Sequence, residues 1–119
     1  MNESMLEKAR EVGRLLGQTE EYKALRRAQE RLNDDRESVE RLNRLVELER
    51  EITQDLRAGK TPSQEVQQEY EDKASDLQGS SIYQGVVAAQ SNFDKLMQKV
   101  NDEIGQGMQA GAQSSIILP

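Results

Sequence analysis

The residues of this chain whose spacing could support catalysis or metal binding are its acidic side chains, which occur in close groups. The groups are Glu20/Glu21, Asp34/Asp35, Glu47/Glu49/Glu51 and Glu69/Glu71/Asp72. A di-metal site in a helical bundle pairs inward-facing glutamates with Glu-x-x-His motifs, and this sequence contains no histidine. The acidic residues alternate with Lys and Arg, which is typical of a solvent-exposed helix face. We therefore predict no metal ligand, no catalytic residue and no cofactor site.

Other catalytic chemistry is excluded by residue types that are missing. The chain has neither Cys nor His, so thiolate nucleophiles, imidazole bases and nearly all zinc sites are excluded. Its Ser and Thr hydroxyls consequently lack the usual general base. The absence of Cys also fits a reducing compartment, and the N-terminus has no apolar core of the signal-peptide type. We expect a soluble, cytoplasmic protein that is not an enzyme and does not enter the membrane.

Arginines form the second charged pattern. They stand at Arg26, Arg27, Arg31, Arg36, Arg41, Arg44 and Arg50. Most have an acidic residue three or four positions away, which predicts intrahelical ion pairs such as Glu37 with Arg41 and Glu40 with Arg44. The alternative is a ridge that meets an acidic partner or an RNA backbone. A net charge of −6 disfavours direct nucleic-acid binding, which requires a basic surface.

These side chains must be positioned by helices, and the longest helical pattern runs from Asp34 to Ala58. Its apolar residues recur at steps of three and four, and no Gly or Pro interrupts it before Gly59. A helix of this length spans about 33 Å. Apolar residues are only 34% of the chain and charged residues 32%, so the sequence predicts a thin helix–helix seam that is completed by self-association.

Local signals divide the remaining chain into further helices. Helices are predicted over about 4–16, from 20 with Thr19 as the N-cap, from 34 with Asp34 as the N-cap, over about 62–78, and from 81. Gly59 is placed just after the long helix, Thr61 at the N-cap of the next helix, and Pro62 at the first position of that helix. The short connection predicts that this next helix packs antiparallel on the long one. The fold class is thus an all-α antiparallel hairpin or bundle of about four to five helices with one long central helix.

The apolar faces of these helices supply the candidate packing and oligomer interface. The tyrosines are interpreted as packing residues with the hydroxyl at the rim. The candidate residues are Tyr22, Leu25, Leu42, Leu45, Ile52, Leu56, Tyr70, Phe93, Leu96, Val100 and Ile104. The members from 42 to 56 are expected to meet those from 93 to 104, within one chain or between chains.

Glycines near the C-terminus predict that the last helix weakens there. Gly105 and Gly107 precede a glycine- and serine-rich end, so a helical domain over 1–107 and a flexible tail over 108–119 are expected. The apolar ending at 116–118 is interpreted as a weak docking segment.

The stretch LGQTEEYKALRRAQERLNDD resembles the YlbF/YmcA family, including its YheA-like members. The resemblance rests on a leucine, a Ser/Thr-Glu-x-Tyr core, a second leucine and an acidic stop before a long helix. The matching residues here are Leu16, Thr19, Glu20, Tyr22, Leu25 and Asp34. It continues through the long helix, the GKTPSQE loop and the segment KLMQKVNDEIG, and covers about residues 5–105.

This resemblance implies an all-α regulatory protein that assembles with itself, as a homodimer or higher homo-oligomer, or with paralogues. Members regulate competence, biofilm formation and sporulation in a complex that works with the endoribonuclease RNase Y. The iron–sulfur clusters of some members are not expected here, because their ligating cysteines are absent. The leading hypothesis is a non-enzymatic regulatory adaptor that acts through helix-mediated contacts. The alternative is a structural or chaperone-like self-assembling coiled-coil module.

Overall fold

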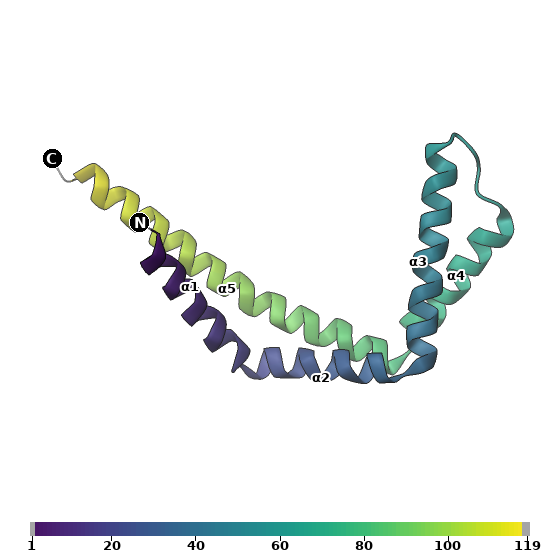
Figure 1. Ribbon diagram of the computed structural model, residues 1–119, viewed down its shortest axis with the longest axis horizontal. Coiled ribbons are helices and arrows are strands. Elements are labelled where there is room, and N and C mark those ends of the chain that lie inside the picture. Colours follow the sequence, from purple (N-terminus) through teal and green to yellow (C-terminus); the bar gives the residue numbers. More distant parts are fainter. Residues whose placement is uncertain (1, 118–119) are drawn as a thin grey trace. The chain divides into compact units, whose positions relative to one another are not determined.

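The structure is a computed structural model that describes the backbone of residues 2–117 and the side chains of residues 2–113. It consists of five α-helices (Figure 1), which are α1 (Glu3–Gly17), α2 (Glu20–Asp34), α3 (Arg36–Arg57), α4 (Gln64–Gln78) and α5 (Ser81–Ile117). The described backbone contains no strand, which confirms the predicted all-α class.

None of the helices within residues 2–117 has both the length and the apolar character that a membrane-spanning helix requires.

Capping side chains set where α2 and α3 begin. Thr19 caps α2 as predicted, because its Oγ1 accepts a hydrogen bond from the backbone N–H of Tyr22 at 3.1 Å. The N-cap of α3 is Asp35 rather than Asp34, so that prediction was wrong by one residue. Asp34 still belongs to α2, whereas Asp35 has an extended backbone and accepts from the N–H of Ser38 at 3.1 Å.

The loop between α3 and α4 contains one confirmed and one corrected prediction. Gly59 has a φ of 74°, the left-handed conformation that a glycine after a helix C-terminus adopts without strain. The N-cap of α4 is Ser63 and not Thr61. Ser63 is the residue with extended φ and ψ, and its Oγ accepts from the N–H of Val66 at 3.2 Å. Pro62 therefore precedes the cap instead of following it.

The chain divides into two compact units, which are Arg26–Ala88 and the combination of Met1–Leu25 with Ala89–Pro119. In the first unit, α3 and α4 pack side by side and run in opposite directions (Figure 1), as their short connection predicted. Leu48 lies at the centre of this hairpin and is 0% exposed, and Ser38 is 1% exposed. Leu32 and Leu77 are also buried in this unit. The core is thus a thin seam, in line with the low apolar content.

In the second unit, α1 lies along the C-terminal part of α5 (Figure 1). Tyr22 packs against Phe93 with ring centroids 5.6 Å apart and a tilted geometry that suits aromatic pairs. Among the side chains that the structure describes in this unit, the buried apolar ones are Leu25 and Ala89, and α1 contributes none. This two-helix arrangement leaves much of its apolar face uncovered.

The length of α5 differs from expectation. The helix continues through Gly105 and Gly107 to Ile117, so these glycines neither end it nor separate residues 108–117 as a non-helical tail. Glycine costs a helix about 1 kcal/mol per residue but keeps the backbone N–H, whereas proline removes it. No proline occurs within α5. Residues 118–119 lie outside the described chain, as do all side chains of the apolar ending at 116–118.

Candidate protein-interaction surfaces

The acidic groups are engaged in ion pairs along the helices. Arg41 pairs with Glu37 as predicted. The expected pair of Glu40 with Arg44 is not formed, because Glu40 pairs with Arg36 at 3.3 Å and Arg44 turns towards α4. Among the described residues, no three acidic side chains converge in a way that could hold a metal ion.

Arg44 forms the strongest polar contact between α3 and α4. Its Nε and Nη2 donate to the two carboxylate oxygens of Glu69 at 2.7 and 2.8 Å, and its Nη1 donates to Glu47 at 3.0 Å. Such a fork-to-fork geometry fixes orientation as well as charge. The hydrogen bonds from Arg44 hold the pKa of the Glu69 carboxyl below its ordinary value, and those to Glu69 and Glu47 raise the pKa of Arg44. This pair locks the register of the hairpin.

The predicted interface residues fall into three classes of exposure. Leu25 is buried. Eight others are half-buried, namely Tyr22, Leu42, Leu45, Ile52, Tyr70, Phe93, Leu96 and Val100. Leu56 and Ile104 are exposed, at 63% and 53%. The members from 42 to 56 belong to one compact unit and those from 93 to 104 to the other, so a seam between these two sets stays a prediction.

An apolar surface lies on α1 and the C-terminal half of α5. Its exposed members are Met5, Leu6, Val12, Leu15, Ile104 and Met108. A groove of about 430 Å³ crosses this surface, and its lining residues are Val12, Lys99, Val100, Glu103 and Ile104. We call these exposed members and lining residues together the α1–α5 surface. A run of exposed apolar side chains on neighbouring helices is typical of a protein-binding site.

Sequence reasoning placed only part of this surface among the candidates. Val100 and Ile104 were predicted, whereas the α1 members and Met108 were missed. The signal for α1 was the apolar stripe that includes Met5 and Val12 at helical spacing. Met108 was assigned to a flexible tail, because the glycines around it concealed the continuing helix.

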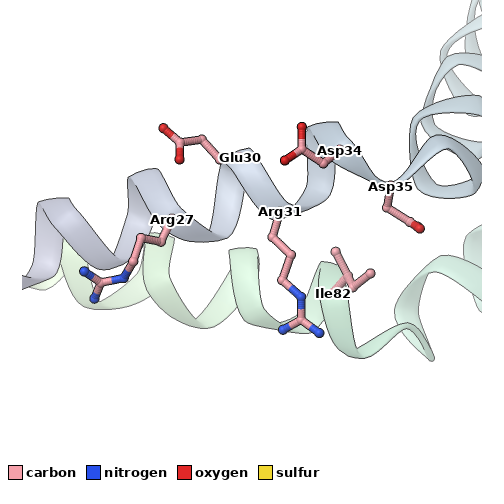
Figure 2. A pocket seen from close by; sticks show the side chains of 6 residues that line it. All are labelled: Arg27, Glu30, Arg31, Asp34, Asp35 and Ile82. Atoms are coloured by element: carbon pink, nitrogen blue, oxygen red, sulfur yellow. The ribbon is translucent and has the colours of Figure 1, made fainter.

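A second, charged groove lies in the unit formed by residues 26–88. It has a volume of about 460 Å³ and is lined by Arg27, Glu30, Arg31, Asp34, Asp35 and Ile82. Figure 2 shows that the guanidinium groups of Arg27 and Arg31 extend to the same side of α2, towards α5. The carboxylates of Glu30 and Asp34 point to the opposite side of that helix (Figure 2).

Helices α2, α3 and α4 lie wholly, and α1 and α5 largely, within a segment that matches a known family. The family model described as "Control of competence regulator ComK, YlbF/YmcA" matches residues 5–109. The chain belongs to the YlbF/YmcA family. No curated protein matches the chain. The YlbF/YmcA match covers every predicted interface residue and all of the α1–α5 surface. This family is a regulatory one, so a role of the competence-regulator type follows from membership.

Proposed function

We propose that this YlbF/YmcA member is a non-enzymatic regulatory adaptor that acts through helix-mediated protein contacts. The observation that carries the proposal is the α1–α5 surface, where Leu15, Ile104 and Met108 are 51–68% exposed within the family-matched region. Burying apolar area releases roughly 25 cal/mol per Å², so this surface favours association with another helical protein.

A second copy of the chain is the first partner that we propose for this surface. Two α1–α5 pairs packed face to face form a four-helix bundle, the usual way in which a helical hairpin covers its apolar side. The charges on α5 support an antiparallel, two-fold arrangement. Lys99 and Glu103 flank the groove four residues apart, so an axis between them brings Lys99 of each copy opposite Glu103 of the other. Val100 and Ile104 would then be covered by apolar residues of the second α5.

Paralogues of the family and an endoribonuclease of the RNase Y type are the further partners that we propose. These two partners are proposed from the family's regulatory role and not from the geometry of the α1–α5 surface. Iron–sulfur clusters held by cysteines form no part of the proposed adaptor, because the chain has no cysteine.

The self-association can be tested by light scattering coupled to size-exclusion chromatography. The double variant Val12→Ser/Ile104→Ser removes apolar contact from the α1–α5 surface, and we expect it to shift the protein from dimer towards monomer. The matched control is Val46→Ser, which alters a residue of similar exposure (52%) on α3 and should leave the mass unchanged. A dimer that survives the double variant would contradict this placement.

Adaptor function can be separated from a structural or chaperone-like module by a second assay. The exposed methionines on the α1–α5 surface are adaptable apolar groups that suit either role. Affinity purification from the host, followed by mass spectrometry, should recover paralogues or an endoribonuclease reproducibly if the chain is an adaptor. Suppression of aggregation of unrelated unfolded proteins, without any stable partner, would instead support the chaperone-like alternative.

A further inference from the structure

Helix α1 is held against α5 by apolar contact alone. The side chains of residues 3–15 are all exposed, and only Leu16, near the end of the helix, is half-buried. Val12 lies with Val100 of α5 in the lining of the groove on the α1–α5 surface. Among the described residues, no hydrogen bond or ion pair joins α1 to α5, since the ion pair that α1 forms lies within the helix itself.

The helix is also weak in itself. Its N-cap residue Asn2 makes no side-chain hydrogen bond to the first turn, whereas Asp35 and Ser63 cap α3 and α4. Gly13 lies in its interior, and a Cβ at that position would meet nothing within 4 Å, so no close neighbour requires a glycine there. Isolated helices of up to about 15 residues are marginal in water, and an interior glycine weakens them further. α1 therefore depends on tertiary contacts of which it makes few.

The turn after α1 is fixed more firmly than the helix. Thr19 donates from its Oγ1 to the carbonyl oxygen of Leu16 at 2.7 Å and accepts from the N–H of Tyr22 at 3.1 Å. Tyr22 in turn packs on Phe93 of α5. The start of α2 is thus anchored by contacts that do not involve α1, and the change from firm to weak attachment falls at Thr19.

The α3–α4 hairpin provides an internal comparison. Leu48 is 0% exposed there, and Arg44 binds both carboxylate oxygens of Glu69 on the neighbouring helix. Segments with few buried contacts open locally at a much lower free energy than segments with a buried core. The hairpin therefore belongs to the stable part of the chain and α1 to its least stable part.

We propose that α1 is an arm that opens by local unfolding in the free protomer and is clamped shut by a second copy of the chain. Opening stops at Thr19 and uncovers Val100 on α5. The second copy covers Met5 and Leu6, which are 60% and 50% exposed in the protomer, and so binds the closed arm only. The population of the closed arm then sets the apparent affinity of self-association. The clamp rests on the proposed self-association, whereas the opening does not.

Hydrogen exchange of the full chain, followed by mass spectrometry, tests the opening. In dilute protein that light scattering shows to be monomeric, we expect peptides from α1 to exchange roughly a hundredfold faster than peptides around Leu48. Gly13→Ala should slow exchange in α1 about fivefold, the factor by which alanine is favoured over glycine in a helix interior. The matched control is Gly85→Ala, which alters a glycine of α5 in the other unit that also faces open space and should leave exchange in α1 unchanged.

The same measurement at rising protein concentration tests the clamp. As the dimer forms, exchange in α1 should slow by about tenfold or more, because association stabilises the form that it binds. Exchange around Leu48 should not respond in the same way at concentrations where only the arm is opening. The monomer–dimer transition is followed in parallel by light scattering.

The possible results separate the arm from the proposed self-association. Exchange in monomeric α1 that is as slow as around Leu48, or that Gly13→Ala leaves unchanged, would overturn the opening by local unfolding. A dimer that forms without slowing exchange in α1 would overturn the clamp, while self-association stands. A chain that stays monomeric at every concentration would end both self-association and the clamp, and the opening would still be decided by the exchange of the monomer.

Discussion

Replacing Leu48 by alanine is expected to cause the largest loss of stability of any single truncation in the α3–α4 hairpin. Its side chain is 0% exposed, so the change removes buried methyl groups and leaves a cavity that the thin seam cannot refill. Leu-to-Ala changes at such sites cost about 2–5 kcal/mol. For a domain of this size, that corresponds to a fall in Tm of roughly 10–20 °C.

The matched control for this prediction is Leu56→Ala. Leu56 lies on the same helix and belongs to the same sequence stripe, but its side chain is 63% exposed. Its truncation in an isolated protomer should change the free energy of unfolding by at most about 0.5 kcal/mol. If Leu56 is covered in an oligomer, the loss should appear as a concentration-dependent Tm instead.

Thermal unfolding followed by circular dichroism, at two protein concentrations, measures both variants. We expect a large, concentration-independent fall in Tm for Leu48→Ala and a small fall for Leu56→Ala at low concentration. Equal shifts for the two variants at low concentration would refute the burial assigned here.

Three further predictions concern caps, pH and backbone strain. Asp35→Ala should cost about 1 kcal/mol of unfolding free energy in a urea titration, because it removes the N-cap of α3. Asp34→Ala should cost much less, and a reversed order would contradict the assigned cap. The pKa of Glu69 is lowered in the folded state by Arg44. Its contribution is therefore complete above the unfolded pKa of about 4.3 and is lost as the pH falls through the folded value. The stability difference between wild type and Glu69→Gln should accordingly be constant near neutral pH and shrink below pH about 4, and a difference that grows on acidification would show that the sign is wrong. Gly59→Ala should lower the unfolding free energy by about 1 kcal/mol, because alanine is strained at a φ of 74°. No destabilisation in the same urea titration would mean that the loop adopts another conformation.

Much of the secondary structure followed from local signals in the sequence. The cap at Thr19 and the left-handed Gly59 depend on groups that are adjacent in the chain, so their chemistry is visible without a fold. Ambiguity arose where two neighbouring residues could both serve, as with Asp34 and Asp35. An N-cap residue has an extended backbone. Because α2 continues through Asp34, only Asp35 is extended, and Asp35 is therefore the N-cap of α3.

Burial along the apolar stripes was decided by tertiary structure alone. Leu48 and Leu56 are identical residues in one periodic pattern, yet one is inaccessible and the other is largely exposed. Periodicity reports which residues share a face, and it carries no information on which turns of that face another helix covers. Sequence spacing likewise could not identify the main ion-pair partner of Arg44. Acidic residues lie near it in its own helix, but its closest pair is with Glu69 on α4.

The sequence by itself determined the all-α class, the absence of His and Cys chemistry, and the family. These depend on composition and on local order, which the chain carries in any conformation. Only the tertiary structure revealed the uncovered α1–α5 surface and the purely apolar attachment of α1 to α5. Both features arise where residues from distant parts of the chain come together, and that requires the packed helices.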